Sequence, residues 1–229
     1  MGGAALGARV IETAASVVAG SLGVFGGTFD PIHFAHLAVA QEAAEVLGLE
    51  RILFIPAGRP PHKLDREITS SRDRLAMVEL AIEGNPRFAV DRLELDREGP
   101  SYTVDTLEAL RARPSTGGAA TELTLILSSE AYLAMPGWRD PARILELARL
   151  AIAPRDGYPS ADTASLQPPI PGSAGRVTFL DGPRMRLSAS ELRQRASSGR
   201  SIRYLVPDAV AAYIDDHDLY PTPRRTTTT

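Results

Sequence analysis

Short hydrophobic runs alternate with longer helical segments along most of the chain. The runs expected to form strands lie at 22–25, 51–56, 123–127, 150–154 and 177–180, with further extended structure at 88–95. The expected helices span 34–49, 71–83, 102–113, 141–147, 188–198 and 207–217. Strands that alternate with helices of about 10 to 15 residues favour right-handed crossovers and a parallel sheet. The pattern predicts an α/β fold: a Rossmann-like, doubly wound parallel sheet in a single domain with C-terminal helices.

The two ends of the chain differ from the part between them. Residues 1–20 are rich in Ala and Gly, and Glu12 interrupts their apolar stretch, so we expect an N-terminal extension rather than a signal peptide. Residues 21–220 form the expected domain, and 221–229 form a flexible tail. The Pro-, Gly- and Ser-rich span 155–175 is expected to be a surface loop.

Composition excludes several classes of protein. A chain of 229 residues, 44% hydrophobic and with a net charge of −3, suits one compact domain. The lack of cysteine excludes disulfides, a thiol nucleophile and Cys-ligated metals. No apolar run approaches the roughly 20 residues of a membrane-spanning helix, and the near-balanced charge gives no basic field for nucleic acid. We expect a cytoplasmic protein; a homo-oligomer stays open, because such assemblies are common but no residue argues for one.

The segment after the first expected strand, GGTFDPIHFAH, is rich in groups that suit phosphate binding. Ligands of open parallel sheets bind beyond the carboxyl ends of the strands. Gly26 and Gly27 can bring backbone N–H groups close to a phosphate. His33 and His36 share one face of the first helical turn, where two imidazoles can donate hydrogen bonds to phosphate oxygens. A lone His is more often structural, but strand, Gly-Gly and H-x-x-H in register favour a phosphate site.

Lys63 is the one lysine among 25 basic residues. Its ammonium is a compact charge on a flexible stem in a Pro-rich loop, so it can reach a phosphate. A solvated surface lysine is the alternative. The bias of the chain toward Arg favours a specific requirement for Lys at this position.

A second anion site is expected at the start of helix 188–198. Ser188 and Glu191 fit the S-x-x-E capping box. The capped helix start, with Ser190 and with Arg193 one turn in, offers hydroxyls, N–H groups and a guanidinium to an anion. The alternative for Arg193 is a place on a solvated helix face.

Several motifs together carry a family resemblance. GGTFDPIHFAHL resembles the (T/H)-x-G-H signature of the nucleotidyltransferase superfamily, and the chain is similar to bacterial nicotinate-nucleotide adenylyltransferases. The motifs PPHK, RLAMVELAI, NPRF, GPSYTVDTL, Trp138 and LSASELR occur in the order of that family, and the match covers about 22–220. Two departures are Ala35, where the family has Gly, and Ser128-Ser129-Glu130, where it has G-x-D.

The resemblance implies adenylyl transfer from ATP to nicotinate mononucleotide, which gives deamido-NAD and pyrophosphate in NAD biosynthesis. It implies Mg²⁺ on the triphosphate, no protein nucleophile and no named metal ligand. The implied catalytic residues are His33, His36, Lys63 and Arg193. The implied ATP-binding residues are Gly26, Gly27, Thr28, Phe29, His33, His36, Glu130, Ser188, Ser190 and Arg193. The implied mononucleotide-binding residues are Lys63, Tyr102, Thr103 and Trp138, whose ring would stack on the pyridine.

The preference for an acid or an amide substrate is open at this stage. Ser101-Tyr102-Thr103 begins an expected helix, whose unpaired N–H groups favour a carboxylate over a neutral amide. A plain N-cap is the alternative for Ser101. Other acceptors, such as nicotinamide mononucleotide, and a non-catalytic ATP-binding relative are the alternative functions. Arg72, Asp73 and Arg74 look like helix-surface charges, and no role is assigned to them.

Overall fold

The computed structural model describes residues 18–60, 68–113, 121–158, 170, 172–173 and 175–221. Four of the expectations above lie wholly or mostly outside these ranges. They are the N-terminal extension up to residue 17, Lys63, most of the span 155–175 and the tail after Pro221.

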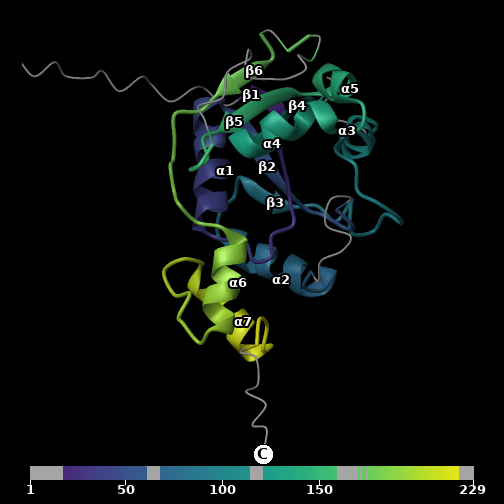
Figure 1. Cartoon of the computed structure of the whole chain (residues 1–229). Coiled ribbons are helices and arrows are strands. Elements are labelled where there is room, and N and C mark those ends of the chain that lie inside the picture. Colours follow the sequence, from purple (N-terminus) through teal and green to yellow (C-terminus); the bar gives the residue numbers. More distant parts are fainter. Residues whose placement is uncertain are drawn as a thin grey trace, which may run out of the picture.

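The described residues form one parallel sheet of six strands with helices on both faces (Figure 1). The strands are β1 (Val18–Gly27), β2 (Leu49–Pro56), β3 (Phe88–Val90), β4 (Glu122–Ser128), β5 (Arg149–Ala153) and β6 (Val177–Phe179). Their order is β3-β2-β1-β4-β5-β6, and every pair is parallel. This is the strand order of the doubly wound fold, so the expected fold class is confirmed.

Seven α-helices and one short 3₁₀ helix connect and cover the described strands. They are α1 (Phe34–Val46), α2 (Ser71–Ile82), α3 (Thr103–Arg111), α4 (Ser129–Ala134), η2 (Met135–Gly137), α5 (Pro141–Leu147), α6 (Ala189–Ser197) and α7 (Asp208–Asp216). In Figure 1, α6 and α7 lie beside α2 at the lower end of the molecule. The hydroxyl of Tyr213 on α7 donates to Asp73 Oδ1 on α2 at 2.9 Å, which joins the C-terminal helices to the rest of the domain.

Alternate side chains of the sheet enter two separate cores, as expected for strands with a side-chain period of two. Val24 lies in register with Leu53 and Leu125, and all three belong to the core covered by α3, α4 and α5. Phe25 lies in register with Phe54, and both belong to the core covered by α1, α2, α6 and α7. Both faces of the sheet are therefore buried, which explains the continuous hydrophobic runs of its strands.

Most element ends lie within two residues of the sequence prediction, and three boundaries differ by more. The first strand begins at Val18, inside the stretch assigned to the N-terminal extension. Helix α1 ends at Val46 rather than at residue 49, because Gly48 adopts a left-handed backbone with φ of 60° and β2 begins directly after it. The extended stretch expected at 88–95 is a strand only over 88–90, since the Asp96 N–H turns back to donate to the Arg92 carbonyl.

The strand order reverses between β1 and β4. Connections from these two neighbouring strands run in opposite directions, which leaves a crevice at their carboxyl ends. Gly27 ends β1 and Ser128 ends β4. The GGTFDPIHFAH segment and the Ser128-Ser129-Glu130 segment therefore leave the sheet side by side.

Candidate active site

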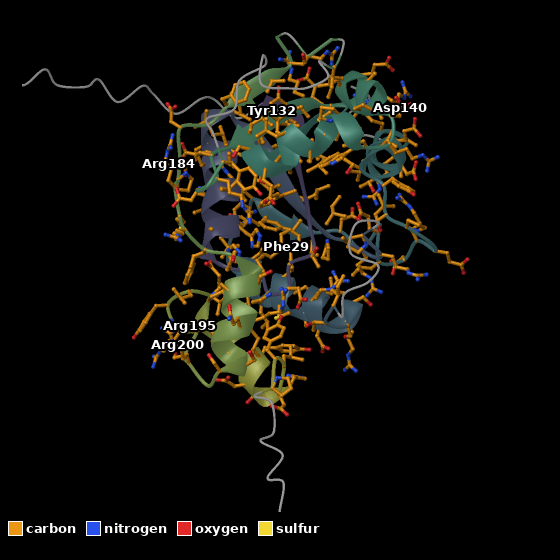
Figure 2. The ribbon with its side chains drawn as sticks, viewed as in Figure 1. Phe29, Tyr132, Asp140, Arg184, Arg195 and Arg200 are labelled. Carbon is orange, nitrogen blue, oxygen red and sulfur yellow. The ribbon has the colours of Figure 1, made fainter. Side chains whose placement is uncertain are left out.

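The turn between β1 and α1 has a backbone fixed by packing. Phe29 adopts φ of 50°, a left-handed conformation that side chains rarely take, and its ring is only 2% exposed. The ring contacts those of Phe25 and His36 edge-on, with centroids 5.8 and 5.2 Å away. A Cβ on Gly27 would lie 2.9 Å from it, so Gly27 cannot carry a side chain without displacing Phe29. In Figure 2, Phe29 lies between the sheet and α6.

His33 and His36 lie together at the start of α1. His33 is the N-cap residue, and its N–H donates to His36 Nδ1 at 3.2 Å. The two rings stack with centroids 3.7 Å apart and planes 19° apart. Because a backbone N–H can only donate, His36 Nδ1 is the acceptor, and a neutral His36 carries its proton on Nε2. The Nε2 position of His36 is therefore a donor at the start of α1.

His33 is buried and held neutral. Its side chain is 4% exposed. Burial, and after it the positive charge of Arg155, lowers the pKa of His33 from 6.5 to about 4. Its Nδ1 atom is buried without a hydrogen-bond partner among the described residues. Such an atom is unusual in a folded protein and marks a position where a ligand contact fits.

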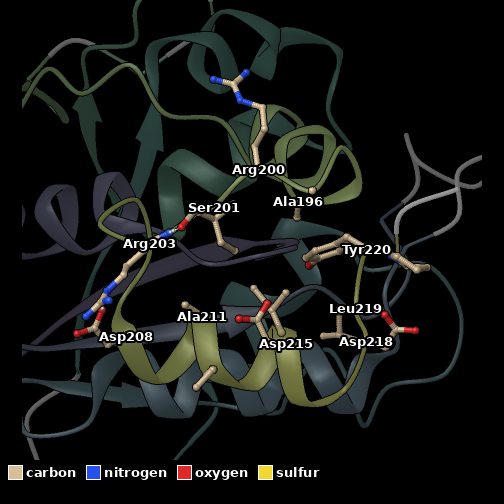
Figure 3. A pocket seen from close by; sticks show the side chains of 15 residues that line it. Ala196, Arg200, Ser201, Arg203, Asp208, Ala211, Asp215, Asp218, Leu219 and Tyr220 are labelled. Atoms are coloured by element: carbon tan, nitrogen blue, oxygen red, sulfur yellow. Dashed lines mark hydrogen bonds and ion pairs between the residues drawn. The ribbon is translucent and has the colours of Figure 1, made fainter.

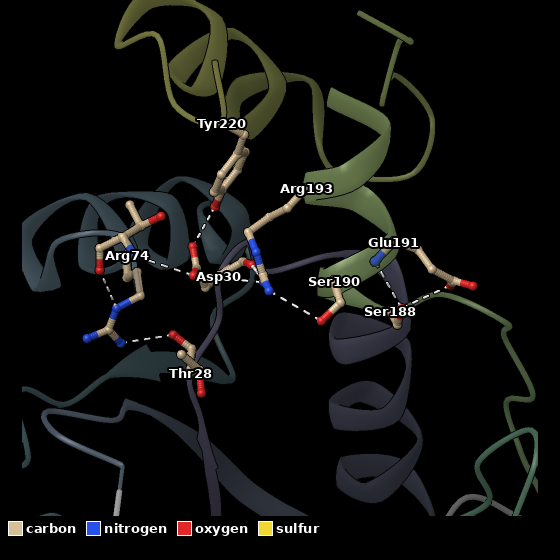
Figure 4. A network of polar contacts seen from close by, with 9 residues as sticks. Thr28, Asp30, Arg74, Ser188, Ser190, Glu191, Arg193 and Tyr220 are labelled. Atoms are coloured by element: carbon tan, nitrogen blue, oxygen red, sulfur yellow. Dashed lines mark hydrogen bonds and ion pairs between the residues drawn. The ribbon is translucent and has the colours of Figure 1, made fainter. Parts of the chain in front are cut away.

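The structure brings Arg193 from α6 to the β1–α1 turn (Figure 4). Its Nη1 donates to the Asp30 carbonyl at 2.6 Å, lies 3.8 Å from Asp30 Oδ2, and its Nη2 donates to Ser190 Oγ at 3.3 Å. Asp30 is 3% exposed and also accepts from the Tyr220 hydroxyl at 2.7 Å and from the Thr69 N–H at 3.4 Å. We call Asp30, Thr69, Arg193 and Tyr220 the Asp30 network.

The expected capping of α6 is confirmed in its main contact. Ser188 Oγ accepts from the Glu191 N–H at 3.2 Å and donates to Glu191 Oε2 at 2.9 Å. The Glu191 carboxylate therefore binds the Ser188 hydroxyl, and this cap leaves Ser190 and Arg193 on the side of α6 that faces Asp30.

The assignment of Arg74 to the helix surface is wrong. Its side chain is 2% exposed, its Nε donates to the Thr69 carbonyl at 3.0 Å, and its Nη1 donates to the Thr28 carbonyl at 2.9 Å. Burial lowers its pKa, and the charge of Asp30 opposes that shift. Arg74 therefore supports the backbone of the glycine-rich turn from the side of α2 (Figure 4).

Its two neighbours differ in their placement. Arg72 is exposed, as expected. Asp73 is partly buried, and its N–H donates to Ser70 Oγ at 3.1 Å at the start of α2. Ser70 is therefore the N-cap of this helix.

Glu130 faces a residue that the sequence reasoning missed. Its carboxylate forms an ion pair with Arg155, with Oε2 3.0 Å from Nη1, and accepts from the Tyr158 hydroxyl at 2.8 Å. The Arg155 N–H donates to Ser129 Oγ at 3.1 Å, while Ser128 Oγ caps α4 by accepting from the Ala131 N–H. Arg155 follows the carboxyl end of β5 closely, and that position in a parallel sheet is the signal that could have identified it.

The three expected mononucleotide residues that the structure describes lie near the start of α3. Tyr102 is its N-cap residue, without a side-chain cap, and Thr103 is its first residue. Trp138 follows η2, its N–H donates to the Met135 carbonyl at 2.9 Å, and it packs with Tyr102 against the same core. The guanidinium carbon of Arg139 lies 4.9 Å from the centre of the Tyr102 ring. The structure thus brings Tyr102, Thr103 and Trp138 together.

Ser101 ties this helix start to the segment that leads toward Lys63. Its N–H donates to the Arg59 carbonyl at 3.0 Å, and its Oγ accepts from the Arg59 N–H at 3.3 Å. Ser101 is therefore not the N-cap of α3. The described residues beyond the Lys63 segment resume near Thr69, which contacts Asp30. Two described residues on either side of that segment, Arg59 and Thr69, thus contact the start of α3 and the Asp30 network, respectively.

A separate open hollow of about 690 Å³ lies between α6 and α7 (Figure 3). It is lined by residues such as Arg203, Asp208 and Asp215, and of the Asp30 network it includes only Tyr220. Across the described ranges, no three His, Asp or Glu side chains are grouped as a metal site would require. Nor do these ranges contain a helix with the length and apolar character needed to span a membrane.

Comparisons with known proteins agree on one family. A family model described as Cytidylyltransferase-like matches residues 24–195. A probable nicotinate-nucleotide adenylyltransferase of Thermomicrobium roseum is 45% identical over 201 residues, which cover 88% of this chain and 92% of the relative. Another, of Roseiflexus sp., is 44% identical over 199 residues, covering 87% of this chain and 97% of the relative.

Solved structures share the fold. The Plasmodium falciparum nicotinic acid mononucleotide adenylyltransferase complexed with NaAD superimposes with a TM-score of 0.69 at 18% identity. The superposition covers 87% of this chain and 97% of that chain. At this level of identity the likeness supports the architecture of the domain.

Proposed function

The chain belongs to the nicotinate-nucleotide adenylyltransferase family, and on that premise we propose that ATP and nicotinate mononucleotide meet at the carboxyl ends of β1 and β4. The reaction is adenylyl transfer from ATP to nicotinate mononucleotide, which gives deamido-NAD and pyrophosphate in NAD biosynthesis. The observation that carries the proposed location is the His33–His36 pair, at the start of α1 and at the point where the strand order reverses.

In the proposed reaction the protein aligns two phosphates and stabilises charge. A phosphate oxygen of the mononucleotide forms a bond to the α-phosphorus of ATP, and the bond from that phosphorus to the bridging oxygen breaks as pyrophosphate leaves. His36 donates from Nε2 to a phosphate oxygen, because its Nδ1 accepts from the His33 N–H. The neutral His33 offers its unpartnered ring nitrogen at the same helix start. Fixed donors of this kind stabilise charge that develops during displacement.

Cations from two sides complete the proposed ATP site. Arg193 reaches the turn from α6, and the charge of Arg155, which follows β5, acts on His33 at that turn. Gly26, Gly27 and Thr28 offer backbone groups at the turn, while Phe29 holds its shape. The remaining proposed contacts are those of Ser188, Ser190 and Glu130. Glu130 acts through its ion pair with Arg155.

The mononucleotide is proposed to lie against the start of α3. The ring of Trp138 stacks on the pyridine, and the backbone of Tyr102 and Thr103 receives its substituent. Tyr102 and Trp138 pack on one core, which supports this grouping. Lys63 is proposed to reach the phosphates from the segment that joins this helix start to the Asp30 network.

A divalent metal accompanies ATP in this family, and we propose that it is Mg²⁺. Magnesium typically binds substrate phosphates and water with few protein ligands. It therefore enters with ATP as part of the substrate, and no side chain of this chain is proposed as its ligand. Bound in this way, it neutralises charge on the triphosphate.

Two further properties belong to the proposal. The domain is proposed to run to residue 220, where Tyr220 contacts Asp30, and its first strand begins at Val18. The reaction is proposed to take place in the cytoplasm, in keeping with a chain that contains no cysteine.

Pyrophosphate release by the purified chain, with ATP and Mg²⁺, tests the proposal. Nicotinate mononucleotide should support turnover. His33→Ala and His36→Ala should each lower kcat by about 100- to 1,000-fold, because one donor to the developing charge is lost. His217→Ala is the matched control, since His217 is exposed at the end of α7, and it should leave kcat within about twofold of the wild type. Near-normal turnover of His33→Ala would contradict the assignment.

A further inference from the structure

The backbone around Arg139 is fixed on both sides. Trp138 ends η2 in an extended conformation, with its N–H bound to the Met135 carbonyl. Asp140 adopts φ of 46° and caps α5 by accepting from the Arg143 N–H at 3.1 Å. Trp138 packs on the core together with Tyr102, and the Arg139 side chain lies over the Tyr102 ring.

The guanidinium of Arg139 lies at the first turn of α3. Its central carbon is 4.9 Å from the centre of the Tyr102 ring, and its Nη1 is 3.3 Å from Asp105 Oδ2. Its side chain is 58% exposed, so solvent and small molecules can reach it. An arginine side chain has five N–H donors. Among the described residues the Asp105 carboxylate is its one ion-pair partner, which leaves donors for a ligand.

We propose that Arg139 determines specificity for the carboxylate of the pyridine mononucleotide. This inference rests on the proposed function, since it places the pyridine on Trp138 and its substituent at the start of α3. A substrate carboxylate there meets the guanidinium of Arg139, which the Tyr102 ring and the Asp105 carboxylate already hold in place. A carboxamide is neutral and gains no such charge interaction. Arg139 thus adds a side-chain contribution to the preference for the acid.

Because Arg139 forms an ion pair with Asp105, the inference can be tested by substituting each residue in turn. The informative result is the direction in which each substitution changes affinity for the acid. Removing Arg139 removes a cation that attracts the substrate carboxylate. Removing the charge of Asp105 frees the guanidinium and also removes an anion from the same helix turn. If Arg139 recognises the carboxylate, the two substitutions change affinity for the acid in opposite directions. If the ion pair only holds the loop against α3, both substitutions break the same contact and change affinity in the same direction.

The chain offers a matched control pair one helical turn away. Arg143 Nε lies 3.0 Å from Glu108 Oε1, so this ion pair also joins the α5 region to α3. Its two side chains are 44% and 49% exposed. Arg143→Gln and Glu108→Gln therefore remove the same charges and a similar tie between elements, farther from the start of α3.

The experiment measures two quantities on the full chain for nicotinate mononucleotide and for nicotinamide mononucleotide. The first is KM from pyrophosphate release with ATP and Mg²⁺. The second is Kd from the fluorescence of Trp138, the one tryptophan, which needs no turnover. Arg139→Gln should raise both constants for the acid about tenfold and leave those for the amide unchanged. Arg139→Lys should give an intermediate value.

The opposite variant and the controls complete the test. Asp105→Asn should lower KM and Kd for the acid by about threefold. Arg143→Gln and Glu108→Gln should leave the acid-to-amide ratio within about twofold. The inference is overturned if Arg139→Gln leaves the acid-to-amide ratio of KM and of Kd unchanged. It is also overturned if Arg139→Gln and Asp105→Asn change the affinity for the acid in the same direction. In both cases wild-type turnover still supports the proposed function. If the wild type binds the acid in an Arg139-dependent manner but releases no pyrophosphate, the inference stands and the proposed function fails.

Discussion

His33 makes the stability of the folded chain sensitive to acid. The pKa of its imidazole is about 4 in the folded protein and near 6.5 in the unfolded chain. Between these values the unfolded state binds more protons, so the free energy of unfolding falls as pH falls through this window. The total loss is about 3 kcal/mol, complete below pH 4.

Denaturant unfolding at pH 7, 5.5 and 4 measures this effect, with His33→Gln as the comparison. The variant lacks the titrating group. Between pH 7 and pH 4 its free energy of unfolding should therefore fall by about 3 kcal/mol less than that of the wild type. Other groups titrate in both proteins and cancel in the difference. Equal pH dependence of the two proteins would show that His33 is not held neutral by its surroundings.

We expect Arg74 to stabilise the folded protein. Arg74→Met removes the donors to the Thr28 and Thr69 carbonyls inside the protein. We expect the free energy of unfolding to fall by about 3 kcal/mol, because buried acceptors lose their partner. Arg72→Met, two positions away and exposed, should change it by less than about 0.5 kcal/mol. Comparable denaturant midpoints for the two variants would contradict this role.

The sequence reveals residue chemistry better than residue burial. The stacked His33–His36 pair follows directly from H-x-x-H after a strand and a glycine pair. Arg74 was misplaced because its charge suggested a solvated position. Yet Arg74, Met77 and Val78 stand at the i, i+3 and i+4 positions of one helix face, and all three are buried. Helical spacing would have identified the buried face, but it could not reveal the two carbonyls that Arg74 binds.

At the scale of a single element, the cap of α6 links stability to ligand binding. Ser188→Ala removes the acceptor for the Glu191 N–H and should lower stability by about 1 kcal/mol. It should also raise KM for ATP, because the capped end of α6 carries Ser190 in its first turn and Arg193 one turn in. Ser197→Ala at the other end of the helix should change neither quantity, since its hydroxyl only bonds the nearby Gln194 carbonyl. A lower Tm with an unchanged KM for ATP would confine Ser188 to capping.

The sequence predicted strands correctly where the hydrophobic runs are long. It did not predict the residues at which those strands begin and end. The runs at 51–56, 123–127 and 150–154 became β2, β4 and β5 with one or two residues added or lost at their ends. The stretch 88–95 keeps a strand-like alternation, but the Asp91 N–H makes its last bond to β2, at the Phe54 carbonyl. Which residue makes the last ladder bond depends on the neighbouring strand, and a local pattern does not contain that information.

For the whole molecule, the main unpredicted feature is convergence on Asp30. Arg193 and Tyr220 lie 163 and 190 residues after Asp30 in the sequence, and the sequence analysis treated the glycine-rich turn and the start of α6 as two unconnected motifs. In the fold, Arg193 and Tyr220 both reach the buried Asp30 carboxylate. Burial raises the pKa of Tyr220 above its ordinary value. The C-terminal helices are thereby fastened to the backbone that carries the two histidines.

Tyr220→Phe tests whether this fastening positions Arg193 or only adds stability. The variant leaves the buried Asp30 carboxylate with one donor fewer, so the free energy of unfolding should fall by about 1 to 3 kcal/mol. If Asp30 and Tyr220 together set the position of Arg193, KM for ATP should rise while KM for nicotinate mononucleotide stays unchanged. Tyr204→Phe is the control, because that residue is 76% exposed. Loss of its hydroxyl should change neither the free energy of unfolding nor KM for ATP.

A double substitution separates the two explanations further. Once Asp30→Asn has removed the carboxylate charge, Tyr220→Phe should cost less stability than it does in the wild type, because the two side chains share one contact. Additive losses would show that the hydroxyl acts on another partner. A lower Tm without any change in KM for ATP would mean that α7 only covers the domain, and that Ser190 and the Asp30 carbonyl suffice to place Arg193.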